Sequence, residues 1–192
     1  MTTTISTNQL KDLIQYRLPE YQALALDIHE HPEVSNYEFY SSAALIKQLE
    51  KERFWVEKEV AGHRTAFDAR YISNKPGPTI AFLAEFDALP GIGHACGHNL
   101  FGTYSVLAAS IVKQFIDETG GEIRVYGTPG EEGGENGSAK GSFVREGFFE
   151  DVDVALCVHP AFRYGKTTES LANDPVDIIF YGVRSEERRV GK

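Results

Sequence analysis

The sequence predicts an α/β fold, and two observations carry this prediction. Segments with apolar residues at helical spacing alternate along the chain with short apolar segments of strand length, which is the order of elements in α/β proteins. In addition, the segment from Ile80 to Ala84 is almost continuously apolar. Such a run is typical of a strand in a sheet that has helices on both faces.

Two helices are expected at the start of the chain. Apolar residues recur at helical spacing between about Thr7 and His29, and Pro19 marks a kink or a restart in this segment. Ser35-Asn36-Tyr37-Glu38 then has the form of a capping box. It predicts a second helix, in which Phe39, Ala43, Ile46 and Leu49 then continue one face and which ends near Arg53.

Five strands and one more helix follow. The strands are expected at Phe54 to Val60, Ala66 to Ile72, Thr79 to Phe86, Glu122 to Gly127 and Asp153 to Val158. Leu100, Tyr104, Leu107, Ile111 and Phe115 mark a helix that is apolar on almost all sides and is therefore buried. Functional sites of α/β sheets collect at the carboxyl ends of strands, and Asp87, Glu131, Glu132 and His159 all fall there.

Size and charge restrict the functions that are possible. The chain has 192 residues, of which 42% are hydrophobic, so one domain with a full core is expected. The net charge of −9 argues against a nucleic-acid partner, and no stretch approaches the ~20 apolar residues of a membrane helix. The first residues do not resemble a signal peptide. We therefore expect a cytoplasmic protein that acts on a small or neutral substrate, without a membrane or nucleic-acid partner.

The loop around residues 94–98 is the strongest candidate site. Three of the eight His and Cys residues, His94, Cys96 and His98, lie within these five positions. In an extended segment Cys96 and His98 project to the same side and can reach one ion. If Asn99 caps the following helix, the partial positive charge of the helix start favours a thiolate at Cys96.

Two further groups complete this candidate site. Glu131 and Glu132 follow a predicted strand, so one carboxylate can bind a metal while its neighbour handles protons, provided that the loop bends. His159 supplies a second imidazole. Thiolate, imidazole and carboxylate ligands together suit zinc and related transition metals better than magnesium or calcium. The chemistry expected of such a site is activation of a water for attack on a carbonyl carbon.

Other interpretations remain open for these residues. Cys96 and His159 could form the nucleophile and base of a cysteine hydrolase, which would leave Glu131, Glu132 and His98 without a role. A structural zinc site is also possible, although such sites are usually richer in cysteine. His29 and His31 could also form a metal site, but we favour the interpretation that they make ordinary loop and capping contacts. Cys96 and Cys157 could form one disulfide in principle, but a reducing compartment favours a ligand or core role. Cys157 is expected in the core because its neighbours are apolar.

The motifs resemble those of a known family, the amidohydrolase branch of the aminoacylase and carboxypeptidase-G-type metallopeptidases. The resemblance rests on five segments and covers Tyr16 to about Tyr181 in order. These segments are His31-Pro32-Glu33, Phe86 to Pro90, His94 to Asn99, Gly127 to Glu132 and Val158-His159-Pro160. Within the family, the segment that ends in Asn99 is similar to that of p-aminobenzoyl-glutamate hydrolases and related dipeptidases.

The resemblance implies a fold, a reaction and a set of site residues. The fold is a zinc-peptidase-type catalytic domain with a mixed central sheet flanked by helices. Cys96, His98, Glu132 and His159 would be metal ligands, Glu131 the general acid and base, and Asp87 a carboxylate that orients a ligand. The cofactor would be two divalent ions, zinc or else manganese or cobalt. The substrate would be an N-acyl amino acid, aminobenzoyl-glutamate or a dipeptide-like amide. Glu85 is left out of the ligand set, and no substrate-binding residue is assigned.

The end of the chain departs from the family pattern. Family members are roughly twice as long, with an inserted dimerisation or lid domain and a last ligand histidine after it. We expect residues 1–174 to be the N-terminal part of the catalytic domain and 175–192 to begin a truncated lid domain and end in a charged tail that does not continue as the family does. The parent chain would be a homo-oligomer through that lid. The truncated chain is expected to expose apolar surface where the missing part should pack. The alternative to an active enzyme is a catalytically incomplete fragment that still binds metal.

Overall fold

A computed structural model describes residues 5–134, 136–166 and 181 of the chain. The chain divides into two units, Met1–Pro160 and Ala161–Lys192, and every described helix and strand lies in the first. The expected domain boundary between residues 174 and 175 lies outside the described residues. In the described part of the chain, no helix has both the length and the apolar character needed to cross a membrane.

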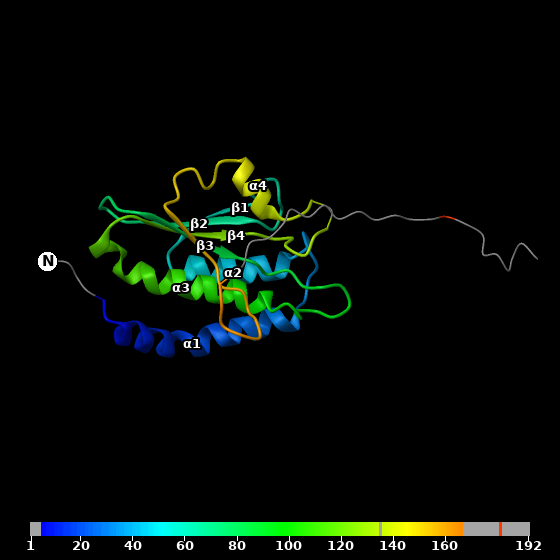
Figure 1. Cartoon of the computed structure of the whole chain (residues 1–192), viewed down its shortest axis with the longest axis horizontal. Coiled ribbons are helices and arrows are strands. Elements are labelled where there is room, and N and C mark those ends of the chain that lie inside the picture. The colour runs from blue at the N-terminus through cyan, green and yellow to red at the C-terminus, as the bar shows by residue number, and fades with distance from the viewer. Residues whose placement is uncertain (1–4, 135, 167–180, 182–192) are drawn as a thin grey trace, which may run out of the picture. The chain divides into compact units, whose positions relative to one another are not determined.

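The first unit is built on a mixed five-stranded sheet, as predicted (Figure 1). In the order in which they pair, the strands are β1 (Trp55–Lys58), β2 (Phe67–Ile72), β4 (Glu122–Gly127), β3 (Thr79–Ala84) and β5 (Val154–Leu156). β3 pairs in parallel with both β4 and β5, whereas β2 is antiparallel to β1 and β4. The carboxyl ends of β4, β3 and β5 therefore meet at one edge of the sheet.

Helices cover both faces of this sheet. On one face lie α2 (Phe39–Lys51) and α3 (His98–Thr119), with α1 (Thr7–Glu30) packed on their outer side, and on the other lies α4 (Ala139–Arg145) (Figure 1). Neighbouring residues of β3 contribute to two separate cores. Phe82 packs with the larger cluster under α1 to α3, and Ala81 packs with Tyr126 and Phe143 on the α4 side. This confirms the prediction that β3 is covered on both faces.

A kink or a restart was predicted at Pro19, and the first helix runs continuously through this residue, so the restart is wrong. Ser6 and Gln9 form a capping box at its start. Tyr21, Ala25 and Ile28 bury its second half, and the Tyr21 hydroxyl donates to Ser110 Oγ of α3 at 2.9 Å. Packing of this face therefore keeps the helix continuous, although Pro19 has no backbone N–H and the helix lacks one hydrogen bond there.

The capping box predicted for α2 is wrong. Glu38 is the N-cap residue, but its own side chain makes no cap hydrogen bond. Instead, the Glu33 carboxylate accepts from the backbone N–H groups of Tyr40 and Ser41, each at 2.9 Å. The side chains of Ser35 and Glu38 are thus used elsewhere in the fold.

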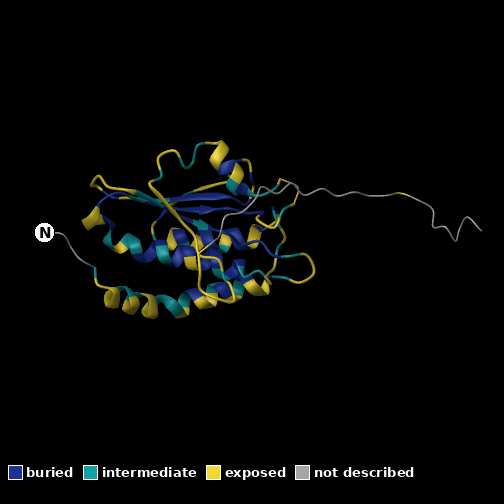
Figure 2. Cartoon of the chain, viewed as in Figure 1, coloured by how far each residue is buried: buried dark blue, intermediate teal, exposed yellow. Residues whose placement is uncertain are grey.

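The two edge strands are shorter and more exposed than predicted (Figure 2). Val154 and Leu156 of β5 are 43% and 45% exposed, and Cys157 is exposed as well. The prediction that Cys157 is a core residue is wrong because nothing in the described residues covers this side of β5. Leu156, Cys157 and Val158 line an apolar groove together with residues of α1 and α3.

Candidate metal centre

The candidate site lies at the edge of the sheet where the parallel strands end. The chain continues from β3 through Glu85 and Asp87, and from β4 into the loop that carries Glu131 and Glu132. His159 follows β5, and the first turn of α3 brings in His98. The site is thus assembled from three neighbouring strand ends and one helix start.

His98 is the centre of this arrangement. Its Nε2 lies 3.2 Å from His159 Nε2 and 3.2 Å from Glu85 Oε2. The same nitrogen is 3.8 Å from Glu131 Oε2 and 3.9 Å from Glu132 Oε1. Two groups of ligand atoms, Glu85 with His98 and His159, and His98 with Glu131 and Glu132, each lie within 4.8 Å of one another. Donors at such separations can share a cation, because two ligands of one zinc ion are ~3.3 Å apart at zinc–nitrogen distances of ~2 Å.

Asp87 fixes the orientation of the His98 ring. Its Oδ1 is 2.9 Å from His98 Nδ1, and its Oδ2 accepts from Ser35 Oγ at 2.8 Å and from the Glu132 N–H at 2.9 Å. Burial alone would raise the pKa of Asp87, but these hydrogen bonds outweigh it and lower the pKa below 3.8. With its Nδ1–H donated to Asp87, the neutral His98 ring directs the Nε2 lone pair into the cluster.

The surroundings of Cys96 differ from those expected. Cys96 lies in a turn and not in an extended segment, and Gly97 (φ 81°) is the N-cap of α3. Asn99 does not cap the helix, because its side chain donates to the Ala25 carbonyl. A hydrogen bond with the Glu132 carboxylate, followed by burial, raises the pKa of the Cys96 thiol to about 11. The predicted thiolate is therefore wrong for the metal-free chain, and a cation that binds this sulfur must displace a proton.

Glu131 and Glu132 follow a loop that bends, as their division of roles requires. The Glu131 side chain is 37% exposed and that of Glu132 is 22% exposed. Burial and then the negative charge of Glu85 raise the pKa of Glu131. A carboxylate with a raised pKa is a better proton acceptor than a free one.

Sequence reasoning excluded Glu85, which the structure brings into the cluster. Glu85 is buried, its Oε1 pairs with Lys140 Nζ of α4, and its Oε2 has no hydrogen-bond partner among the described residues. The neighbour of Oε2 is His98 Nε2, which can donate to it only when the ring is protonated. A buried carboxylate oxygen without a donor, beside imidazole nitrogens, suits a bound divalent cation. Its spacing of two residues from Asp87 was the signal that could have identified it.

His29 and His31 make ordinary ring contacts. His31 stacks on Tyr40 with ring centroids 4.1 Å apart, and His29 lies 6.2 Å from His94. Neither His29 nor His31 joins a candidate metal group in the described part of the chain.

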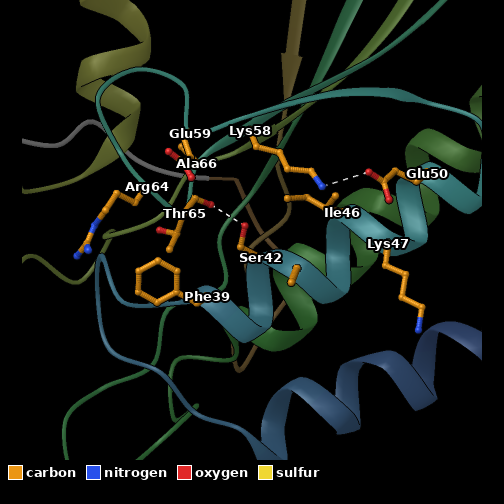
Figure 3. A pocket seen from close by; sticks show the side chains of 11 residues that line it. Phe39, Ser42, Ile46, Lys47, Glu50, Lys58, Glu59, Arg64, Thr65 and Ala66 are labelled. Atoms are coloured by element: carbon orange, nitrogen blue, oxygen red, sulfur yellow. Dashed lines mark hydrogen bonds and ion pairs between the residues drawn. The ribbon is translucent and has the colours of Figure 1, made fainter.

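A separate pocket lies between α2 and the segment that precedes β2 (Figure 3). Phe39, Ser42 and Arg64 are among its lining residues, and Ser42 Oγ donates to the Thr65 carbonyl at 2.8 Å. Lys58 and Glu50 form an ion pair of 3.3 Å at its other end. None of the candidate metal-binding residues lines this pocket, so the metal chemistry is not expected there.

Known proteins from bacteria and mammals have sequences similar to this chain. It is 39% identical to one of the subunits of the Escherichia coli p-aminobenzoyl-glutamate hydrolase, over 91% of the chain and 39% of that protein. It is 32% identical to the mouse Xaa-Arg dipeptidase over 85% of the chain and 40% of that protein. The chain thus spans about two fifths of the length of these relatives. No family model matches it.

A solved structure supports the same assignment. A Bacillus subtilis protein described as a dinuclear metal-binding peptidase of the M20 family superposes with a TM-score of 0.63. The two are 26% identical, and the match covers 71% of this chain and 41% of that one. Together with the 39% identity over most of the sequence, this shows that the chain belongs to the M20 family of peptidases and aminoacylases.

Proposed function

We propose that this chain is the metal-binding part of an amidohydrolase that cleaves an amide bond of N-acyl amino acids, aminobenzoyl-glutamate or dipeptide-like substrates. The observation that carries the proposal is the position of His98 Nε2, 3.2 Å from His159 Nε2 and within 4 Å of Glu131 and Glu132. The substrate class follows from the names of the relatives, which are hydrolases of such amides. Because the chain covers only part of their length, the activity belongs to the whole protein.

The residues divide into ligands, an orienting group and a proton carrier. Cys96, His98, Glu132 and His159 hold two divalent cations, for which the sulfur and nitrogen donors favour zinc over magnesium or calcium. Bound cations of this kind supply an acidified water, with a pKa near ~7, and polarise the amide carbonyl. Asp87 holds the His98 ring in the orientation that binding requires. Glu131 accepts the proton of the attacking water and then delivers it to the leaving nitrogen.

The alternative of a cysteine hydrolase receives less support from this geometry. A nucleophilic cysteine needs a depressed pKa, whereas the pKa of Cys96 is raised to about 11 by the Glu132 carboxylate.

We further propose that the protein is cytoplasmic and that residues 175–192 begin a lid domain through which the whole protein forms a homo-oligomer.

The roles are tested by metal analysis and kinetics of the whole protein. Glu131→Gln is expected to lower kcat by about 10²-fold or more while the metal content stays unchanged, since the ligands remain. Cys96→Ala and His159→Ala should lose metal. The matched control is Glu118→Gln, which alters an exposed glutamate of α3 and should change neither quantity.

Three outcomes would contradict the proposal. Equal metal loss in Glu131→Gln, Cys96→Ala and His159→Ala would show that Glu131 and Glu132 are not divided as proposed. A wild-type protein without stoichiometric zinc, manganese or cobalt, whose hydrolysis is unaffected by a strong chelator, would refute metal dependence altogether. A protein that binds metal but cleaves none of these amides would instead be a metal-binding scaffold.

A further inference from the structure

The turn of residues 35–38, which lies before α2, contacts the loop that carries the two catalytic-site glutamates. We call these the 35–38 turn and the carboxylate loop (residues 130–137, of which residue 135 is not described). Glu38 Oε1 accepts from the Gly130 N–H at 2.9 Å, and Asn36 Nδ2 donates to the Gly137 carbonyl at 3.3 Å. The turn therefore holds the carboxylate loop at its two ends, although the two segments are about 90 residues apart in the sequence.

The two segments approach so closely that glycine is needed in the loop. Gly130 has φ 72°, and a Cβ at this residue would lie 2.6 Å from Asn36 Nδ2. Gly134 has φ 111°, and its Cβ would lie 3.2 Å from Ser35 Cβ. Both residues combine a left-handed backbone with a neighbour at contact distance, so the loop is shaped to fit the turn.

Glu38 is a fully buried carboxylate, and donors from three segments compensate its burial. Besides the Gly130 N–H, its Oε1 accepts from the Asn36 N–H at 2.8 Å, and its Oε2 accepts from Thr65 Oγ1 at 2.8 Å. Burial of a carboxylate is costly unless several donors compensate it. This side chain therefore joins the turn, the carboxylate loop and the segment before β2 at one point.

A chain of buried side chains fixes the orientation of Asn36. Because Asn36 Nδ2 donates to Gly137, its Oδ1 faces His63 Nδ1 at 2.7 Å, which must then carry the proton. His63 Nε2 accepts from Ser142 Oγ at 3.0 Å, and Ser142 in turn accepts from Arg145 at 2.7 Å. The network links α4 to the loop and leaves each of these groups with a partner.

The same turn also holds the group that orients His98. Ser35 Oγ donates to Asp87 Oδ2 at 2.8 Å, and this oxygen also accepts from the Glu132 N–H. One short segment is therefore bonded to the carboxylate loop and to Asp87, which together surround the candidate metal centre.

We propose that the 35–38 turn is the positioning element of the active site and that Glu38, through the Gly130 N–H, sets the place of Glu131 and Glu132. This inference rests on the proposed function for its catalytic consequence. Glu38 contacts no reacting atom, so it acts only through the loop. The pattern that resembles a capping box is, in this fold, a support for the catalytic carboxylates.

The test compares Glu38→Met, which removes the acceptors at similar length, with Glu38→Gln, which keeps one. Thr65→Val is the matched control, because it removes a hydrogen bond to Glu38 without touching the carboxylate loop. In the metal-loaded whole protein, Glu38→Met should lower kcat by about 10- to 100-fold with a smaller change in KM, since supporting residues around metal ligands have effects of this size. Glu38→Gln should recover most of the loss, and Thr65→Val should stay within about twofold of the wild type.

A second measurement does not depend on activity. Hydrogen exchange of the metal-free protein should show that the Gly130 amide loses protection in Glu38→Met and keeps it in Thr65→Val. If Glu38→Met does not fold, Ser35→Ala replaces it and should lower kcat several-fold through Asp87 without a change in the unfolding midpoint.

The outcomes separate this inference from the proposed function. Wild-type kcat and unchanged Gly130 protection in Glu38→Met, or equal losses in Glu38→Gln and Glu38→Met, would overturn the positioning role. So would a wild-type kcat in Ser35→Ala where that variant is needed. A wild-type protein that neither binds metal nor hydrolyses amides would refute the proposed function, while the exchange measurement still decides whether Glu38 holds the loop.

Discussion

The carboxylates that surround His98 raise the pKa of its ring. Burial disfavours a charged His98, but the hydrogen bond with Asp87 and the charges of Glu85 and Glu131 outweigh it and raise the pKa of the ring. Among the described residues, Lys140 is the lysine that pairs with this group of acids. A divalent cation relieves the same crowding, so metal binding is linked to release of protons from the site.

His63 gives a prediction for pH dependence away from the metal. Burial lowers the pKa of His63 below 6.5, the nearby Arg145 guanidinium lowers it further, and Glu146 opposes the shift. The neutral ring is thus favoured by folding. Its contribution to the free energy of unfolding is complete above the unfolded value of ~6.5 and is lost as the pH falls through the lower, folded pKa.

We therefore expect the metal-free wild type to lose more stability than His63→Gln when the pH falls from about 7.5 to about 5. Denaturant unfolding at several pH values measures this difference, and the chelator present in each sample removes metal linkage. His31→Gln is the control, because His31 is exposed and stacks on Tyr40 at the surface. Parallel pH profiles for wild type and His63→Gln would contradict the expectation.

At the residue scale, sequence reasoning succeeded where a side chain follows a strand. Asp87, Glu131 and His159 were expected near one another because parallel strands end at one edge, and the structure brings them around His98. Their roles remain predictions. Glu38 was misinterpreted because a capping box is a local pattern, whereas its partner Gly130 is distant in the sequence and appears only in the folded chain.

At Gly102, α3 packs closely against the segment that follows β3. A Cβ at Gly102 would lie 2.6 Å from the Glu85 carbonyl oxygen and 3.1 Å from Leu45 Cδ1. The backbone that follows β3 cannot move away from α3 without displacing Glu85 and Asp87. The close approach of this helix is therefore part of what fixes the site.

Gly102→Ala should destabilise the protein by about 1–3 kcal/mol, because overpacking forces backbone shifts, and should weaken metal binding. The matched control is Gly141→Ala in α4, where the nearest atom is Arg145 Nη1 at 3.4 Å. That change should be neutral or stabilise by up to about 1 kcal/mol, since alanine is the better helix former. Denaturant unfolding and chelator competition measure both effects; equal stability of the two variants would exclude the close-packing explanation.

The presence of the helices and strands was easier to predict than the residues at which they begin and end. The α/β class and the buried β3 follow from apolar periodicity, which reports burial directly. Predicted strands at Phe54 to Val60 and Asp153 to Val158 shrink to β1 and β5 because both lie at the edges of the sheet, where only one side has a partner. Edge position depends on strand order, which local patterns do not encode.

At the scale of the whole molecule, the two edges of the sheet differ in character. The residues of β1 include the charged side chains of Glu57 and Lys58, which is a common protection against pairing with another chain. β5 instead exposes Val154 and Leu156, and the exposed Val158 follows it beside the apolar groove. Among the described residues no strand pairs with the outer side of β5, and an uncharged edge of this kind favours association between copies of the chain.

The polypeptide of residues 1–192, expressed by itself, is therefore expected to associate in a concentration-dependent manner and to bind a hydrophobic dye. Leu156→Lys places a charge in the groove and on the free edge of β5, and it should lower both the sedimentation coefficient at high concentration and the dye fluorescence. Val144→Lys is the matched control, because Val144 is 65% exposed on α4 and does not line the groove. If both variants lower association to the same extent, general surface charge explains the effect and not the β5 edge. If neither differs from the wild type, association does not use this face. A lysine buried in such an interface would lose its hydration, so Leu156→Lys would have weakened the association.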